Sequence, residues 1–137
     1  MKDKLVIHKG LEVCSSVKHG YGVFTTTKIS SGSIVEECMC CIQTIPLSTQ
    51  ILNEYRFSGP KILMQGEETP TIKYHVIPTG FGMVYNHSHK PNMEWVHDVD
   101  NRLVVFKAVR DIQAYEELTH DYGPSFKQHT KKWQNYI

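Results

Sequence analysis

The sequence predicts a mainly β domain with short helices. Short segments rich in β-branched and aromatic residues recur along the chain, and clusters of glycine, proline and serine separate them. Little of the chain has a helical pattern, so sheets should supply most of the packed structure. At 137 residues the chain is long enough for one domain with a buried core.

Five segments have the composition of strands. They are KLVIHKG (4–10), GYGVFTTTKI (20–29), SIVEECMCCI (33–42), MVY (83–85) and RLVVFKAVRDI (102–112). The third alternates poorly between apolar and polar residues, which is expected of a strand covered on both faces. The turn residues SSVKHG (15–20) separate the first two strands.

The middle and the end of the chain have weaker patterns. STQILNEYRFSG (48–59) predicts a short helix, which Ser48 or Thr49 can cap and which Gly59–Pro60 ends. Residues 59–72 have the composition of a loop, and the tail over 124–137 can hold a last helical turn or two.

The charge balance is nearly neutral, with fifteen basic and fourteen acidic residues and a formal charge of +1. Direct nucleic-acid binding is not expected, because no basic block supplies phosphate contacts. The N-terminus has an apolar run of only three residues, too short for a signal peptide. No segment approaches the ~18 apolar residues of a membrane-spanning helix. We therefore expect a soluble, intracellular protein.

Four cysteines occur, at Cys14, Cys38, Cys40 and Cys41. Structural zinc modules usually pair one C-x2-C motif with a second, and this spacing is absent. The last three cysteines lie in a β-rich segment, where small buried apolar residues in a reducing compartment are the simplest interpretation. A structural metal or a disulfide is the alternative.

The segment YNHSHKPN (85–92) concentrates polar residues and invites a metal hypothesis first. On a strand, His87 and His89 would share one face, and His97 or His75 could complete a three-ligand site. A turn-forming Pro-Asn pair follows at once, and no nearby acid is placed as a further ligand, which argues against a metal.

The same segment allows three other interpretations. Asn86-His87-Ser88 is a glycosylation acceptor only in a secreted protein. A hydrolase pairing of Ser88 with His87 lacks the G-x-S-x-G elbow. The last interpretation uses the backbone: the preceding glycines permit close approach, and the Asn86 amide can bond a ligand.

Three blocks, in this order, decide between these alternatives: HGYGVFTT (19–26) with ISSGSIVEE (29–37), then YNHSHKPN (85–92), then AVRDIQAYEELTHDYG (108–123). Together they resemble the SET-domain family of protein lysine methyltransferases, and most closely the minimal SET proteins of large DNA viruses. The resemblance implies a β-clip-like fold of several small sheets with a C-terminal pseudoknot. It makes residues 1–137 one SET domain, with a variable insert at 43–79 and a tail at 124–137 that covers the active site.

The resemblance also implies a cofactor and a set of site residues. The cofactor is S-adenosylmethionine, and no metal is required. The implied cofactor-binding residues are Gly20, Tyr21, Gly22, Asn86, His87 and Phe126. The implied walls of the substrate-lysine channel are Tyr21, Tyr55, His120 and Tyr122, with Trp133 competing with Phe126 as the lid.

Tyr122 is the implied catalytic residue. Methyl transfer from a sulfonium to an amine is an in-line displacement, which needs a neutral amine and aligned reactants rather than an acid–base pair. A tyrosine with the ordinary pKa near 10 is a poor base at neutral pH, so we expect Tyr122 to orient the reacting groups.

Two departures from the family pattern bear on function. His120 stands where many relatives have Phe or Tyr, which leaves the number of methyl groups added open and introduces a side chain that can titrate near neutrality. No cysteine cluster follows Gly123, so the tail or a partner subunit must cover the site, and the viral resemblance makes a homodimer reasonable.

The resemblance implies a lysine-containing protein substrate, with histone tails, and H3 among them, the commonest targets. A virus-encoded member would act on chromatin in the nucleus of a host cell. A non-histone substrate, or a binding module without turnover, are the alternatives. A set of acidic residues could attract a basic peptide or could be a solvated surface: Glu36, Glu37, Glu67, Glu68, Glu94, Asp98 and Asp100. Glu116 and Glu117 are expected to support the fold.

Overall fold

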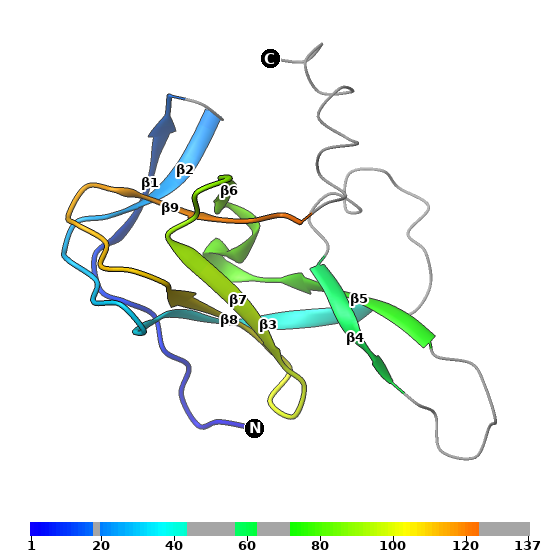
Figure 1. Cartoon of the computed structure of the whole chain (residues 1–137). Coiled ribbons are helices and arrows are strands. Elements are labelled where there is room, and N and C mark those ends of the chain that lie inside the picture. Colours follow the sequence, from blue (N-terminus) through cyan, green and yellow to red (C-terminus); the bar gives the residue numbers. More distant parts are fainter. Residues whose placement is uncertain (18–19, 44–56, 63–71, 124–137) are drawn as a thin grey trace, which may run out of the picture.

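Two β-sheets and one short 3-10 helix, η1, make up the regular structure of the computed structural model, which describes residues 1–17, 20–43, 57–62 and 72–123 (Figure 1). The elements are β1 (Leu11–Ser16), β2 (Gly20–Thr25), β3 (Ile34–Gln43), β4 (Phe57–Ile62), β5 (Ile72–Pro78), η1 (Gly80–Met83), β6 (Asn86–His87), β7 (Met93–Asp98), β8 (Leu103–Ala108) and β9 (Glu117–His120). The predicted mainly β fold of several small sheets is confirmed.

The four-stranded sheet has the order β1-β2-β9-β6 and brings distant parts of the chain together. β1 and β2 form an antiparallel hairpin, and β2 then pairs with β9 over two residues only, Val23 and Phe24. β6 pairs with β9 in parallel, with Asn86 opposite Thr119 and His87 opposite His120. This parallel pair of two short segments is the contact that the predicted pseudoknot requires.

The five-stranded sheet is antiparallel throughout and has the order β4-β5-β3-β8-β7. β8 is an interior strand of this sheet, and its first four residues are all buried. β3 is buried over its successive residues 35–38. The strand predictions at 33–42 and 102–112 are thus confirmed. The poor alternation of the segment at 33–42 reflects burial on both faces at residues 35–38, as expected.

One hydrophobic cluster draws side chains from both sheets. Val23 and Leu118 come from the four-stranded sheet, whereas Val35, Val76 and Phe106 come from the five-stranded one, and all five are 0% exposed. Burial of such side chains is the main favourable term in folding. The segment that leads into β6 packs on the same cluster, so the site described below rests on the core.

The first predicted strand, at 4–10, is wrong. The strand is the next segment, β1, and residues 4–10 make only an isolated bridge between Ile7 and Glu36. Gly10 explains the boundary, because its φ of +94° turns the chain before the hairpin with β2 begins. The predicted turn at 15–20 is correspondingly too long, since Ser16 still pairs with Gly20.

Two further predictions fail where the chain meets the second sheet. Residues 57–59, predicted as the end of a helix, and 59–62, predicted as a loop, belong to β4. β4 is an edge strand whose pairing with β5 shifts between Ser58 and Lys61, and such a bulge at an edge tolerates Gly59–Pro60. The rest of the predicted helix and loop, at 44–56 and 63–71, and the tail at 124–137 lie outside the described residues.

The strand predicted at 83–85 is also wrong. Met83 ends η1, and Val84 continues it with helical dihedrals, donating its backbone N–H to the Phe81 carbonyl over 2.8 Å. Tyr85 donates to the same carbonyl over 3.1 Å. Val84 and Tyr85 pack on the core from this helical turn. A run of three apolar residues in the sequence does not distinguish such a turn from a strand.

Candidate active site

The β6–β9 pair is the centre of the candidate site. Ser88 continues the contact by donating its N–H to the His120 carbonyl over 3.1 Å. Asn92, which is 3% exposed, binds β9 from the other end of the YNHSHKPN segment: its Nδ2 donates to the Glu117 carbonyl over 2.8 Å, and its Oδ1 accepts from Thr119 N over 2.9 Å. The segment is therefore fixed to β9 at both ends.

Asn86 links β6 to β2 through its side chain. Its Nδ2 donates to the Tyr21 carbonyl over 2.9 Å and to Glu117 Oε1 over 2.7 Å. Glu117 Oε2 in turn accepts from the Ser16 hydroxyl over 3.0 Å. Three strands are thus joined around one carboxylate, which confirms that Glu117 supports the fold.

Gly20 and Gly22, the two glycines predicted to bind the cofactor, differ in their surroundings. A Cβ on Gly22 would collide with the Glu117 carboxylate and lie 3.0 Å from Asn86 Nδ2, so any other residue would displace Glu117 or Asn86. Gly20 has a φ of +76° and open space around a hypothetical Cβ. The backbone at Gly20 and Tyr21 is therefore exposed to a ligand, whereas Gly22 is buried beside the Asn86 amide and the Glu117 carboxylate.

Tyr122 follows β9 and is held by the residues around β6. Its hydroxyl donates to the Tyr85 carbonyl over 2.6 Å, and its N–H donates to His87 Nδ1 over 3.1 Å. The second bond requires the His87 tautomer that is protonated on Nε2, and Nε2 lies 3.3 Å from His89 Nδ1. Tyr122 as a whole is 39% exposed, whereas the hydrogen bond of its hydroxyl is partly buried.

His120 forms the buried wall next to Tyr122, with ring centroids 4.8 Å apart. It is 2% exposed and stacks on Phe57 at 5.2 Å, with Phe106 edge-on at 5.4 Å. Burial, with a smaller contribution from His87, lowers the pKa of His120 to about 4, although the Asp121 carbonyl raises it. The imidazole is therefore neutral at physiological pH, so the expected titration near neutrality does not occur.

Sequence reasoning missed Phe57 and Trp95. Phe57 also contacts Trp95 edge-on at 4.8 Å, so a row of aromatic rings runs from Trp95 through Phe57 and His120 to Tyr122. Phe57 stands two residues after the predicted Tyr55, and Trp95 three residues after Asn92. Only their position beside recognised motifs could have indicated them.

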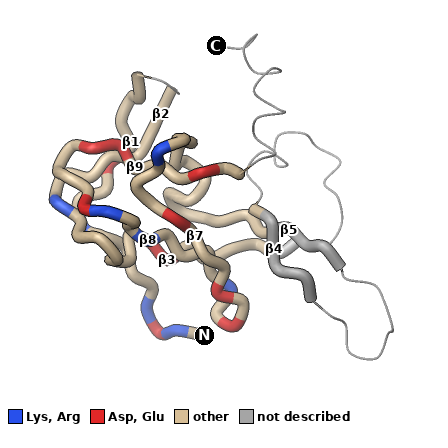
Figure 2. The backbone as a smooth tube through the Cα atoms, in the orientation of Figure 1, with Lys and Arg blue, Asp and Glu red and all other residues tan. Residues whose placement is uncertain are grey.

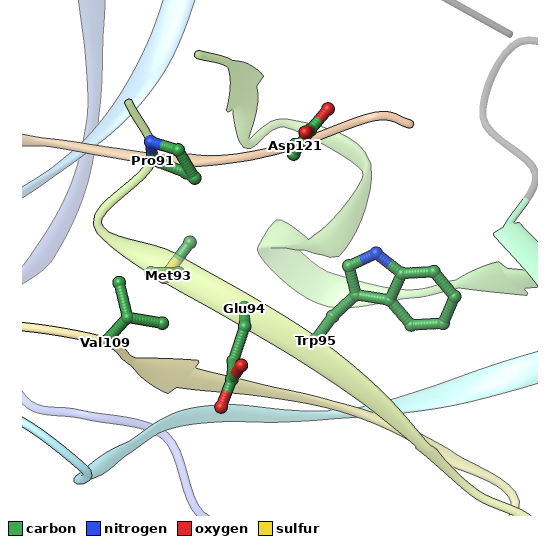
Figure 3. A pocket seen from close by; sticks show the side chains of 6 residues that line it. All are labelled: Pro91, Met93, Glu94, Trp95, Val109 and Asp121. Atoms are coloured by element: carbon green, nitrogen blue, oxygen red, sulfur yellow. The ribbon is translucent and has the colours of Figure 1, made fainter. Parts of the chain in front are cut away.

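A shallow pocket of about 330 Å³ opens beside this row (Figure 3). Its lining consists of Pro91, Met93, Glu94, Trp95, Val109 and Asp121. The pocket adjoins the site through Asp121, the residue before Tyr122, and not through Gly22 and Asn86. It is accordingly a surface next to the tyrosine rather than a cofactor cavity.

The remaining predicted site residues are less defined. Tyr21 is 72% exposed and meets Asn86 through its carbonyl, so its side chain contributes no enclosed wall here. Tyr55, Phe126 and Trp133 lie outside the described residues, as do Glu67 and Glu68.

The histidines and cysteines form no metal centre in the described part of the chain, where no group of three or more His, Cys, Asp or Glu side chains could hold an ion. His87 and His89 contact each other edge-on, with ring centroids 4.6 Å apart. Cys38 and Cys40 are buried as expected, whereas Cys41, predicted to be buried, is exposed, as is Cys14.

The acidic residues divide into two groups. Glu36 and Glu37 are each 2% exposed, so both alternatives, a peptide-attracting surface and a solvated one, are wrong for these two residues. They lie in residues 35–38, the part of β3 that is covered on both faces, as the poor alternation of this segment predicts. Glu94 and Asp100 are exposed, and Figure 2 shows acidic and basic positions interspersed over the described backbone. Glu116 accepts from Arg110 over 2.8 Å, in line with its predicted supporting role.

Among the described residues, no helix is long and apolar enough to span a bilayer.

Comparisons with known proteins agree with this geometry. The family model for the SET domain matches residues 20–123, which is most of the chain. A relative from Schizosaccharomyces pombe, named a histone-lysine N-methyltransferase specific for H3 lysine 37, is 27% identical over 119 residues, covering 86% of this chain and 76% of its own. A Plasmodium falciparum crystal structure, provisionally named a histone methyltransferase, has a TM-score of 0.65 at 26% identity and covers 88% of this chain and 99% of its own. The chain belongs to the SET-domain family of protein lysine methyltransferases.

Proposed function

We propose that this protein-lysine N-methyltransferase transfers a methyl group from S-adenosylmethionine to a histone lysine, with histone H3 its first candidate substrate. The observation that carries the proposal is the β6–β9 pair, which brings Asn86, His87 and Tyr122 into one site. The Schizosaccharomyces pombe relative, which is named as specific for H3 lysine 37, supports the substrate class. A histone substrate places the working enzyme in the nucleus.

The residues around Gly22 fit the cofactor. Gly20 leaves open space beside the backbone, and the Asn86 amide and the Tyr21 carbonyl offer polar partners. Gly20, Tyr21 and Gly22 with Asn86 and His87 would hold it. S-adenosylmethionine, when bound, supplies an electrophilic methyl group on its sulfonium.

Tyr122 would orient the substrate amine. Because its hydroxyl proton is engaged with the Tyr85 carbonyl, the oxygen keeps lone pairs that can accept a hydrogen bond from the lysine. The nucleophile must be the neutral amine, since an ammonium has no lone pair. His120 is buried next to Tyr122 with Phe57 stacked on it, and the loss of solvation in such surroundings disfavours the charged form of an amine placed there. Alignment of this kind supplies up to about 7–11 kcal/mol of a barrier.

The pocket beside Asp121 would receive part of the substrate peptide. Two of its six lining residues, Glu94 and Asp121, are acidic and none is basic. Histone tails are rich in lysine and arginine, so charge complementarity favours their approach on this side. The aromatic row from Trp95 to Tyr122 connects this pocket with the tyrosine.

The test is label transfer from radioactive S-adenosylmethionine to purified core histones, with a chelator present. Wild type should label H3, Tyr122→Phe should lose at least about 100-fold of the rate while retaining the cofactor, and Asn86→Ala should mainly weaken cofactor affinity. Tyr115→Phe is the matched control, because Tyr115 is 78% exposed on the turn before β9 and should label histones as wild type does. Equal activity of Tyr122→Phe, or no binding of the cofactor by wild type, would refute the proposal. Cofactor binding without transfer to any protein would instead support a binding module.

A homodimer and a likeness to the minimal SET proteins of large DNA viruses stay predictions. Light scattering of the purified chain tests the first: a mass of twice the 15.8 kDa chain supports the dimer, and a single-chain mass contradicts it.

A further inference from the structure

Glu36 is a buried carboxylate that lies between β3 and the turn leading into the site. Its Oε2 accepts from the Tyr85 hydroxyl over 2.7 Å, and its Oε1 accepts from the Phe81 N–H over 3.1 Å. Burial and the neighbouring Glu36 charge raise the pKa of Tyr85 and of Cys38 above their ordinary values. Tyr85 and Cys38 therefore keep their protons, and Glu36 is surrounded by donors.

The fold is shaped around this carboxylate. Glu36 is 2% exposed, and no lysine, arginine or histidine in the described ranges forms an ion pair with it. Burying a carboxylate costs several kcal/mol unless hydrogen bonds satisfy its oxygens. Gly80 has a φ of +65°, and a Cβ there would collide with Glu36 Oε1. Such a costly contact, with a backbone turn adapted to it, calls for a role beyond filling the core.

The position of the two bonds indicates that role. Glu36 holds Phe81, at the start of the turn, and Tyr85, at its end, immediately before β6. The carbonyl of Tyr85 is the acceptor of the Tyr122 hydroxyl. We propose that Glu36 is a positioning residue for methyl transfer: through Phe81 and Tyr85 it fixes the Tyr85 carbonyl and hence the direction of the Tyr122 hydroxyl. This inference rests on the proposed function.

Glu37 provides the matched control. It is equally buried at 2% exposed, and its carboxylate accepts from the Lys2 ammonium and from Val6 N over 2.9 Å. Its partners belong to the N-terminal segment, and neither η1 nor Tyr85 is among them. If burial of a carboxylate in β3 served stability alone, the two residues would be equivalent.

The kinetic test compares Glu36→Gln with Glu37→Gln. Phe81 N–H and the Tyr85 hydroxyl both donate to Glu36. A glutamine oxygen can still accept from Phe81, but its NH₂ group must donate to the Tyr85 oxygen, so the hydroxyl loses its bond to a charged acceptor and Tyr85 is held less firmly. We expect kcat of Glu36→Gln to fall about tenfold at saturating cofactor and histone peptide, with KM little changed. Glu37→Gln should lower the melting temperature and keep kcat within about twofold of wild type.

A double substitution separates positioning from general loosening. Since Glu36 acts through the Tyr122 hydroxyl, Glu36→Gln should reduce kcat no further once Tyr122→Phe has removed that hydroxyl. A loss that multiplies with the Tyr122→Phe loss, an equal loss in Glu37→Gln, or wild-type kcat in Glu36→Gln would each overturn the inference. If Glu36→Gln fails to fold, Tyr85→Phe removes one of the two bonds without altering charge and should lower kcat in the same non-additive way.

Amide hydrogen exchange gives a readout that needs no activity. Glu36→Gln should speed exchange of the amides at 81–87 and of Tyr122, whose N–H is bound by His87, and Glu37→Gln should not. If the wild type transfers no methyl group but exchange is faster in Glu36→Gln, the proposed function is refuted, while the inference that Glu36 fixes Tyr85 and Tyr122 is supported. Active wild type with unchanged exchange in Glu36→Gln would refute the inference alone.

Discussion

Gly22→Ala tests whether β2 and Asn86 form one cofactor-binding surface. A Cβ at this position would overlap the Glu117 carboxylate and press on Asn86 Nδ2 from 3.0 Å. Glutamate side chains are usually flexible, but Glu117 is held by Asn86 over 2.7 Å and by Ser16 over 3.0 Å. The substitution must therefore break at least one of these bonds or displace Asn86.

The expected magnitude follows from the bond that lies nearest the new methyl group. The Asn86–Glu117 bond has a charged acceptor, and such bonds contribute about 1.5–3 kcal/mol. The free variant can relax by turning Glu117 aside, but cofactor binding requires the original place of Asn86. Part of the binding free energy is then used to return Asn86 to its original place. A cost of about 2 kcal/mol corresponds to about thirtyfold weaker affinity for the cofactor. Because Tyr122 is held by Tyr85 and His87, kcat at saturating cofactor should change much less.

Titration calorimetry with S-adenosylhomocysteine, which avoids turnover, measures the affinity. Gly32→Ala is the control, since Gly32 has a φ of +80° and open space around it in the turn before β3. An alanine in this conformation costs about 1–2 kcal/mol of stability and should leave cofactor affinity unchanged. An affinity of Gly22→Ala within about twofold of wild type, or an equal loss in Gly32→Ala, would show that Asn86 and Gly22 do not act together.

Three other predictions concern stability and reactivity. The buried His120 has a pKa of about 4, and a histidine in the unfolded chain has one near 6.5, so the stability that the neutral imidazole contributes is complete above about pH 6.5 and is lost toward pH 4. Urea unfolding should therefore show about 2 kcal/mol less stability at pH 5 than at pH 7. The His120→Phe variant should show a smaller difference between the two pH values. Asn92→Ala leaves two backbone groups of β9 without their partners and should cost about 2–4 kcal/mol in the same assay, whereas an exposed-site change, Asp100→Ala, should cost under about 0.5. Iodoacetamide followed by mass spectrometry should label Cys14 and Cys41 first and Cys38 last, because burial shields the Cys38 thiol and raises its pKa; early labelling of Cys38 would contradict this.

Local patterns predicted the strands that contain a run of buried residues. Residues 35–38 of β3 and 103–106 of β8 are buried in succession, so composition alone identified these strands. The segment at 4–10 has the same composition but meets β3 through one isolated bridge, and composition carries no information about partners. The prediction at β4 is wrong for a related reason. Gly59–Pro60 can end a helix or form a bulge in an edge strand, and only the pairing with β5 shows which of the two occurs.

Burial of polar residues was the harder part of the site to predict. Glu36 and Glu37 resemble surface acids in the sequence, and the donors that satisfy them stand at Phe81 and Tyr85 or at the N-terminus. Hydrogen bonds between residues so far apart have no local signature, because each depends on sheet register. The order of the motifs was enough to predict the reaction, whereas the buried residues that support the site could be identified only from the structure.

The two asparagines of YNHSHKPN illustrate how the site divides its work. Asn92 replaces a strand partner, since its amide both donates to and accepts from the backbone of β9. Asn86 instead meets Glu117 and the Tyr21 carbonyl, on the side of the glycines. Tyr122 donates its N–H to His87 and its hydroxyl to the Tyr85 carbonyl, so its orientation depends on a fixed position of β6. Loosening β6 by a change at Asn92 should therefore reduce cofactor affinity and kcat together, whereas crowding at Gly22 should act on affinity alone, and comparing the two variants separates the holding of the cofactor from the alignment of the tyrosine.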